Sequence, residues 1–427
     1  MKRTYLLFGF VPLLIILFSS CRKNESDNIH DKISITSFEP SKGAEGSIIT
    51  FKGKKFGNSA NEFKLFFNGK EALISTFTDT FVTAAVPHGA TTGKISVSSK
   101  GNSATSTNDF TILKGIWVRK KDLPLIIPPP YIPASYLTGR IYTAAFAIGD
   151  KAYAGAGLSP DGNGAGPFLK DWHQYDPAAD QWTRKSDFPI ANGLIVGVSF
   201  AINNKGYVGI GQSNCTPCYL SWTREFWEYD PSTDQWTKKA DLPTNWWKKA
   251  GIGFGVGNKG YAGLGQTWDS TGGIVRKDWW EYDQQINQWI RKADHPGAVQ
   301  LSPAGFVANN KIYLGLGTPS SDRSWWEYDP STDIWTRKSD YPGTFMSGAA
   351  SGGFTIGNKG YISVLSEFWE YDPSNDKWTE VAFFDNYRVA SIAFSIGDKG
   401  YLTTGGGMMF SNTYAARNDL WQFTPPN

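Results

Sequence analysis

Residues 227–236 read Trp-Glu-Tyr-Asp-Pro-Ser-Thr-Asp-Gln-Trp, and close copies of this segment recur along the chain. The first Trp of the segment recurs at Trp172, Trp227, Trp280, Trp326, Trp369 and Trp421. A second segment, Ile-Gly-Asp-Lys-Ala-Tyr at 148–153, recurs between these copies, and its Lys falls at 151, 205, 259, 311, 359 and 399. Six repeats of 40–54 residues, each with four strand-like bursts, are typical of the blades of a β-propeller.

The final Trp of the segment identifies how the ring closes. It recurs only five times within the repeats, at Trp182, Trp236, Trp289, Trp335 and Trp378. The sixth copy is Trp117, which precedes the first repeat. An open ring would leave unpaired strand edges. We therefore predict that the strand at Trp117 pairs into the blade formed by residues 388–423 and closes the ring.

Composition agrees with an all-β chain and excludes several classes of function. The 427 residues include 46 Gly, 18 Trp, 19 Tyr and 27 Phe but only 4 Met, which favours short strands and tight turns over a helix bundle. A balance of 42 basic and 39 acidic residues gives no nucleic-acid footprint. With 4 His and 3 Cys, a catalytic metal cluster is hard to build, and we expect no cofactor.

The Gly pairs that end the second strand of the repeats are a further regularity. They occur as Gly155-x-Gly157, Gly209-x-Gly211, Gly263-x-Gly265 and Gly315-x-Gly317. A residue without a side chain permits close approach of another backbone. We expect this close approach to occur near a crowded propeller axis.

The first 32 residues are typical of an export signal and a tether. Lys2 and Arg3 precede an apolar run from Tyr5 to Phe18, and two Ser residues then lead to Cys21. Residues 17–21 resemble a bacterial lipobox, which implies a signal peptide at 1–20 and a lipidated Cys21. The polar residues 21–32 are expected to form a flexible tether. The resemblance implies an outer-membrane lipoprotein of the cell envelope, held at the membrane through this lipid.

Residues 33–113 alternate apolar and polar residues in short bursts, which predicts a β-sandwich. The segment resembles the TIG family of immunoglobulin-like domains. The resemblance rests on Phe38-x-Pro40-x-x-Gly43, on residues 49–56, on the Phe67-Asn68-Gly69 hairpin and on the closing Phe110-Thr111-Ile112. It implies a spacer or interaction module without catalysis.

Residues 115–427 resemble the kelch family of β-propellers, because a Gly pair, a Trp-x-Tyr-Asp-Pro segment and a further Trp recur in step. The fold expected for the whole chain is therefore an immunoglobulin-like sandwich followed by a six-bladed kelch-type propeller. Copper chemistry of the kelch oxidases is not expected, since His173 and His295 are isolated within the repeats. A sugar epimerase or mutarotase on such a ring stays open as an alternative.

One face of the predicted propeller carries the sequence variation, because its long loops join the second strand to the third and each blade to the next. Variable loops on a rigid scaffold are common binding sites. Aligning the repeats by their Lys places Arg140, Lys248 and Arg388 at the start of the innermost strand, where we expect them to ring the channel mouth. The candidate ligand-binding residues on this face are Trp222, Trp246, Trp247, Trp268, Arg140, Lys248, Arg388 and Tyr387.

Aromatic and basic side chains suit a glycan, neutral or anionic, and suit a protein partner equally well. The loops could also simply pack against one another as a structural scaffold. The Cys215-Thr216-Pro217-Cys218 segment is expected to form a local disulfide in an exported protein. The sequence thus predicts a monomeric, lipid-anchored envelope protein that binds a glycan or a protein of the envelope or exterior.

Overall fold

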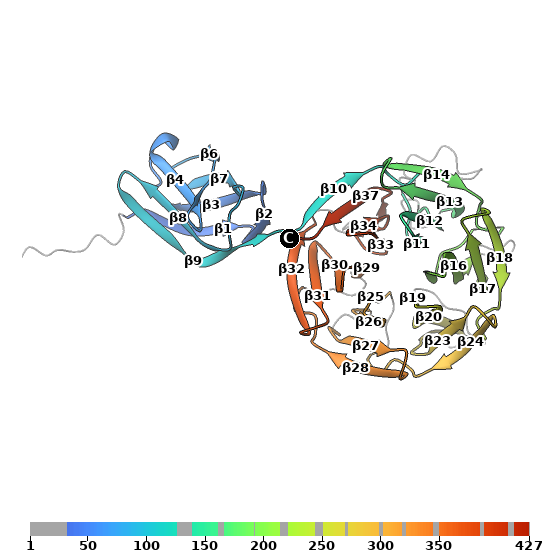
Figure 1. Cartoon of the computed structure of the whole chain (residues 1–427). Helices are drawn as coiled ribbons and strands as arrows, with labels where there is room; N and C mark the ends of the chain where they lie inside the picture. The colour runs from blue at the N-terminus through green and yellow to red at the C-terminus, as the bar shows by residue number, and fades with distance from the viewer. Residues whose placement is uncertain are drawn as a thin grey trace, which may run out of the picture.

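The computed structural model describes residues 32–125, 139–160, 166–191, 193–213, 221–243, 251–269, 272–298, 302–317, 322–344, 350–384, 388–408 and 414–426. It consists of a β-sandwich followed by a ring of six four-stranded sheets (Figure 1). Strand β9 of the sandwich ends at Leu113 and strand β10 of the ring begins at Ile116, so only two residues separate them.

The sandwich has two sheets, with strand orders β1-β3-β7-β6 and β2-β9-β8-β4-β5. Along β3, the alternate residues Ile49 and Phe51 are fully buried, as a half-buried strand requires. Phe67 and Phe110 meet edge to face at 5.0 Å in the core. The Asn68-Gly69 turn, with φ of 44° and 85°, joins β4 to β5. The predicted sandwich is confirmed. Its elements are β1 (Ser34–Glu39), β2 (Lys42–Ala44), β3 (Ile48–Lys54), η2 (Ala60–Glu62), β4 (Phe63–Phe67), β5 (Lys70–Glu71), β6 (Ile74–Phe77), β7 (Phe81–Ala85), β8 (Gly93–Ser99) and β9 (Asn102–Leu113).

Each propeller blade is an antiparallel sheet whose first strand lies nearest the axis and whose fourth forms the rim (Figure 1). The blades are: one, β11 (Ala144–Ile148), β12 (Lys151–Leu158), β13 (Phe168–Asp176) and β14 (Gln181–Lys185); two, β15 (Val198–Ile202), β16 (Lys205–Ser213), β17 (Ser221–Asp230) and β18 (Gln235–Lys239); three, β19 (Ile252–Val256), β20 (Lys259–Gly263), β23 (Trp279–Asp283) and β24 (Gln288–Lys292); four, β25 (Ala304–Ala308), β26 (Lys311–Gly315), β27 (Trp325–Asp329) and β28 (Ile334–Lys338); five, β29 (Ala350–Ile356), β30 (Lys359–Val364), β31 (Glu367–Asp372) and β32 (Lys377–Phe383); six, β33 (Ile392–Ile396), β34 (Lys399–Thr403), β37 (Leu420–Thr424) and β10 (Ile116–Lys120). Two short hairpins, β21 (Gln266–Asp269) with β22 (Gly272–Val275) and β35 (Gly406–Met408) with β36 (Tyr414–Ala416), add to blades three and six.

The ring closes as predicted from Trp117. Strand β10 pairs antiparallel with β37, and Trp117 lies opposite Phe423. The indole of Trp117 packs against Phe368, Phe384 and Phe423 with ring centroids 4.7–5.0 Å apart. Blade six is therefore built from both ends of the propeller sequence, and its rim strand comes from the segment that follows the sandwich.

The register of the third strands corrects one alignment. Tyr175 lies opposite Trp182 just as Tyr229 lies opposite Trp236. His173 therefore occupies the position of Trp227, and Trp172 occupies the preceding position, that of Phe226. The sequence alignment was wrong by one residue here because blade one carries Trp-His where blade two carries Phe-Trp. Trp279 and Trp325 share the fully buried position of Trp172.

The Gly pairs allow close approach on two sides of the second strand. A Cβ on Gly155 would lie 2.1 Å from the Asp171 carbonyl oxygen, and one on Gly209 would lie 2.1 Å from that of Glu225. The first Gly of each pair thus meets the third strand of its own blade. The second meets the segment before the first strand, on the axis side as predicted, because a Cβ on Gly157 or Gly211 would lie 2.7 or 2.1 Å from the carbonyl oxygen of Ile141 or Ile195. The residue between the two glycines has a positive φ, 57° at Ala156, and forms a β-bulge.

Candidate functional site

A cavity of about 190 Å³ lies on the propeller axis, where the first strands of all six blades begin. Each blade contributes lining residues from the start of its first strand or from the residues just before it. The second-to-third connections and the blade-to-blade connections join strand ends at this same end of the ring. The cavity therefore lies at the face on which the sequence placed its variable loops.

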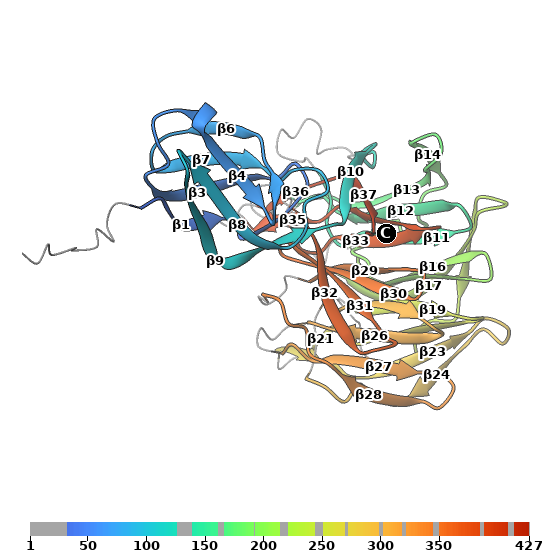
Figure 2. The same ribbon diagram turned by 60° about the vertical axis from the view of Figure 1, so that its left-hand side comes forward.

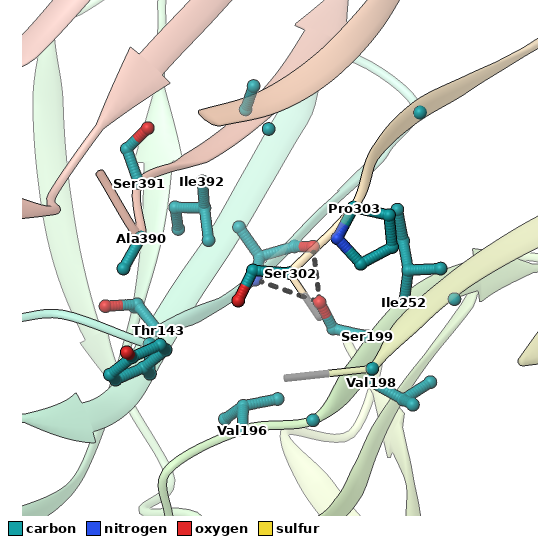
Figure 3. Close-up of a pocket in the computed structure, with 18 of the residues that line it drawn as sticks. Thr143, Val196, Val198, Ser199, Ile252, Ser302, Pro303, Ala390, Ser391 and Ile392 are labelled. Carbon is teal, nitrogen blue, oxygen red and sulfur yellow. Dashed lines mark hydrogen bonds between the residues drawn. The ribbon is translucent and has the colours of Figure 1, made fainter. Parts of the chain in front are cut away.

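The wall of the cavity is uncharged and carries several hydroxyl groups. Thr143, Ser199, Ser302 and Ser391 line it among small apolar residues, and none of the described lining residues is Asp, Glu, Lys, Arg or His (Figure 3). The Ser199 hydroxyl donates to the Ala145 carbonyl of the neighbouring blade at 3.1 Å. The hydroxyls of Thr143 and Ser391 are buried and have no hydrogen-bond partner. A buried hydroxyl without a partner costs about 1–3 kcal/mol, and these two oxygens are themselves withdrawn from the cavity surface.

Small residues keep this part of the axis open. The position that holds Ser199 in blade two holds Ala or Gly in the other five blades, and Gly253, Gly305 and Gly353 are among them. Neighbouring first strands also approach closely, because a Cβ on Gly353 would lie 2.6 Å from the Gly305 carbonyl oxygen. A larger side chain here would both fill the cavity and push the strands apart.

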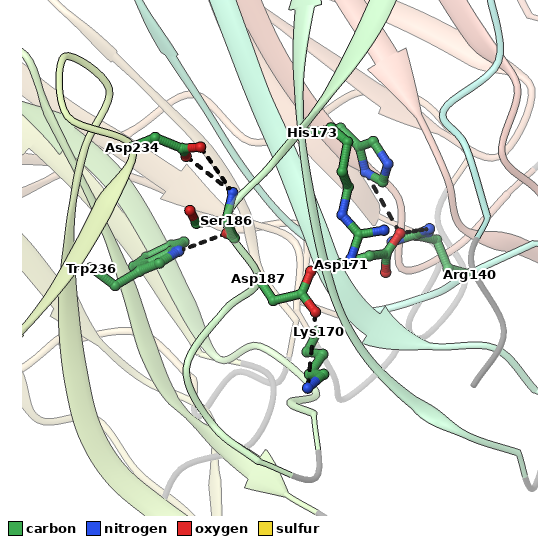
Figure 4. A network of polar contacts seen from close by, with 9 residues as sticks. Arg140, Lys170, Asp171, His173, Ser186, Asp187, Asp234 and Trp236 are labelled. Carbon is green, nitrogen blue, oxygen red and sulfur yellow. Dashed lines mark hydrogen bonds and ion pairs between the residues drawn. The ribbon is translucent and has the colours of Figure 1, made fainter. Parts of the chain in front are cut away.

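Arg140 does not ring the channel mouth, which corrects the prediction. Its side chain is fully buried, and its two terminal nitrogens bind the two oxygens of Asp171 at 3.1 and 2.8 Å (Figure 4). The same guanidinium donates to the Ala156 carbonyl at the β-bulge and to the Pro124 carbonyl. The side chain runs into the blade toward the third strand, where a 3% exposed carboxylate needs a countercharge.

Arg388 repeats this arrangement in blade six and corrects the prediction in the same way. It is fully buried, binds Asp419 at 2.9 and 2.8 Å, and donates to the carbonyl of Thr404, which has a positive φ like Ala156 in blade one. Bidentate pairing of this kind is a specific use of the planar guanidinium. Both arginines are therefore structural ties within their blades.

The acidic partners of these arginines belong to a repeated feature that the sequence analysis missed. The same third-strand position holds Glu225, Asp278, Glu367 and Asp419, and each carboxylate accepts from the indole of the Trp two residues later at 2.7–3.2 Å. In blade one, His173 replaces the Trp and lies 3.6 Å from Asp171. An acidic residue two positions before the repeated Trp was the signal that could have identified it.

Most of the other predicted site residues lie outside the described part of the chain. Trp222 and Trp268 fall within β17 and β21, but their side chains are not among those described. The cavity hydroxyls were not predicted. Thr143 and Ser391 share one repeat position, three residues after Arg140 and Arg388, but Ser199 and Ser302 stand at others, so the periodic signal is weak. The predicted residues outside the described ones are Trp246, Trp247, Lys248, Tyr387, Cys215, Cys218 and Cys21.

The described residues contain no group of three or more His, Cys, Asp and Glu side chains arranged to hold a metal ion. Over the same residues, no helix is long and apolar enough to span a membrane.

Comparison with known proteins identifies the first domain. Residues 34–112 match the IPT/TIG domain family. The chain thus carries an N-terminal IPT/TIG domain. A solved structure described as "Structure of YjhT" matches with a TM-score of 0.53 and 15% sequence identity, over 68% of this chain and 95% of that one. At this identity the likeness shows the fold alone, a β-propeller. A search of the curated proteins with this sequence finds no match.

Proposed function

We propose that this protein is a lipid-anchored envelope protein whose propeller binds a neutral glycan, with one sugar residue entering the axial cavity. The observation that carries the proposal is the uncharged cavity on the axis, lined by Thr143, Ser199, Ser302 and Ser391 among small residues. Sugar hydroxyls both donate and accept hydrogen bonds, so a wall of neutral Ser and Thr residues suits a sugar residue.

The size of the cavity supports a single sugar residue or a chain end as the guest. Pockets for drug-sized ligands measure about 300–1,000 Å³, whereas this cavity measures about 190 Å³. The remainder of a glycan would then lie across the loop face, where Trp222 and Trp268 belong to strands next to the variable loops.

The charges of the site favour a neutral ligand over an anionic one. Of the three basic residues expected at the mouth, Arg140 and Arg388 are committed to buried carboxylates. An anionic glycan would need a countercharge that neither arginine can give without leaving an acid unpaired. A protein partner remains the alternative that fits the same face.

Binding is a better proposal for this cavity than catalysis. Epimerisation or mutarotation needs a group that gives and takes a proton near neutral pH, and carboxylates or imidazoles usually do this. The described lining residues offer neither.

Envelope anchoring rests on Cys21 and the apolar run before it. Metabolic labelling with a fatty acid tests it, and the label should be lost in Cys21→Ser.

A glycan array with neutral and anionic sugars tests the binding proposal. We expect neutral glycans to bind, and Thr143→Val with Ser391→Ala to weaken that binding. The matched controls are Thr403→Val and Ser363→Ala, because these hydroxyls are also buried and unpartnered but lie outside the cavity. Binding restricted to anionic glycans, or equal loss in both pairs of variants, would contradict the proposal. Conversion of the bound sugar to its anomer would favour the enzyme alternative.

A further inference from the structure

Five of the six junctions between blades share one hydrogen-bonded clamp. At the junction of blades one and two, Asp234 accepts from the Ser186 backbone N–H and Trp236 donates to the Ser186 carbonyl, both at 3.0 Å. Each clamp thus uses the turn and the rim strand of one blade to hold the peptide that leaves the rim strand of the blade before it. The other four clamps join Asp180 and Trp182 to Lys121, Asn287 and Trp289 to Ala240, Asp333 and Trp335 to Ala293, and Asp376 and Trp378 to Ser339.

The sixth junction, between blades five and six, is built differently. Blade six has no turn between its third and fourth strands, because its third strand is β37 and its fourth is β10, which comes from the other end of the propeller sequence. Trp117 is the rim Trp of this blade, and its indole nitrogen is buried without a hydrogen-bond partner. At the rim of this junction, the Gly115 N–H donates to the Val381 carbonyl at 2.7 Å, and nearer the axis the Gly352 N–H donates to the Ser391 carbonyl at 3.3 Å.

The IPT/TIG domain lies at this same junction. Its strands β2 and β9 contact β32, the rim strand of blade five (Figures 1 and 2). Lys42 on β2 reaches across the boundary to Glu380 on β32 at 2.6 Å and to Glu367 on β31 at 3.7 Å. Both carboxylates are about 15% exposed and Lys42 is 29% exposed, so the bridge is partly withdrawn from water.

Lys42 supplies the cation that these two acids need. Burial raises the pKa of Glu380, the ammonium of Lys42 opposes that rise, and the charge of Glu367 adds to it. Two carboxylates close together and mostly buried repel each other unless a cation lies between them.

We propose that the IPT/TIG domain acts as the sixth clamp of the propeller, with Lys42 holding blade five against the closing strand. The sandwich is then a working part of ring closure, in addition to any role as a spacer. Opening the ring between β10 and β32 requires the sandwich to undock first. We therefore expect the backbone amides at this seam, the junction of β10 with β32, to be as protected from hydrogen exchange as those at the five clamped junctions.

Amide hydrogen exchange on the full chain tests this proposal. In Lys42→Met, we expect amides of β10 and β32 to exchange about tenfold faster, the scale of losing a partly buried ion pair. Amides of β14 and β18, at clamped junctions, should be unchanged and serve as an internal reference. Lys64→Met is the matched control, because Lys64 pairs with Glu71 on the exposed surface of the same domain at 3.3 Å.

Changes on the propeller side separate the clamp from damage to the sandwich. Glu380→Gln leaves the sandwich intact, and in the Lys42→Met background it should restore part of the lost protection by removing an unpaired charge. Equal exchange at the seam in Lys42→Met and Lys64→Met would overturn the proposal. Acceleration spread evenly over all blades, or no recovery with Glu380→Gln, would overturn it as well.

Discussion

The variant Arg140→Met tests whether Arg140 stabilises its blade or binds a ligand. The substitution keeps most of the apolar volume but removes both hydrogen bonds to Asp171, at 3.1 and 2.8 Å, and those to the Ala156 and Pro124 carbonyls. Asp171 is 3% exposed, and its remaining neighbour is the ring of His173 at 3.6 Å. Burial lowers the pKa of His173 to about 4, so this ring is neutral at pH 7 in the wild-type protein.

The magnitude follows from leaving a carboxylate buried without its partner. Breaking a buried ion pair from one side costs about 3–5 kcal/mol, which is a large share of the stability of a typical domain. Arg140→Lys keeps the charge but not the two-pronged geometry, and we expect it to lose about 1–3 kcal/mol. In the double variant Arg140→Met with Asp171→Leu, no charge is left buried, so most of the stability should return.

Urea unfolding followed by Trp fluorescence measures these differences. With a slope of about 3 kcal/mol per molar, Arg140→Met should lower the midpoint by about 1–1.7 M. Arg184→Met is the control, because its partner Asp187 is three residues away on the exposed rim of the same blade, where such pairs contribute about 0–1 kcal/mol. Equal midpoints for Arg140→Met and Arg184→Met would refute a structural role for Arg140. Loss of glycan binding with unchanged stability would indicate instead that Arg140 binds the ligand.

Two further outcomes concern ring closure and pH. Trp117→Ala should destabilise the propeller by about 3 kcal/mol, the low end of the range for a buried Trp, because the partly buried indole packs against Phe368, Phe384 and Phe423. Thermal unfolding of the variant within about 1 kcal/mol of wild type would contradict closure through β10. Burial lowers the pKa of His295 to about 4, below its ordinary 6.5, so its stabilising effect is full above pH 6.5 and is lost as pH falls toward 4, by about 3 kcal/mol. His295→Phe introduces the residue type that stands at this position in two other blades, as Phe188 and Phe384, and it should remove this loss of stability at low pH. If the urea midpoint falls between pH 7.5 and pH 5 by the same amount in His295→Phe as in wild type, the prediction is wrong.

Local patterns were enough to predict the architecture. Strand alternation, turn residues and repeat spacing are all short-range features, and six repetitions reinforce each of them. The displaced rim Trp was enough to predict that Trp117 joins the last blade. The register error at Trp172 arose because adjacent aromatic residues can exchange places without changing the composition of a strand.

Side-chain direction and long-range partners were beyond the reach of the sequence pattern. Arg140 stands before the first strand of its blade, which suggested a position at the mouth, but its partner Asp171 lies 31 residues further along the chain. Whether a long side chain turns toward the axis or into the blade depends on which acid is buried there. Thr143 and Ser391 share one repeat position, three residues after Arg140 and Arg388, but the pattern does not show that this position lines a cavity on the axis.

Departures from the repeat concentrate where the chain ends meet. Blade six is assembled from two distant segments, and blade one follows it directly; these two blades hold the buried Arg388–Asp419 and Arg140–Asp171 pairs. The Arg140 backbone also joins them, because its N–H donates to the Arg417 carbonyl and its carbonyl accepts from the Gly405 N–H. On the other side of blade six, the shared clamp gives way to Lys42 of the IPT/TIG domain. A ring closed by non-covalent pairing needs additional ties on both sides of the closing blade, and the charged residues of this chain supply them there.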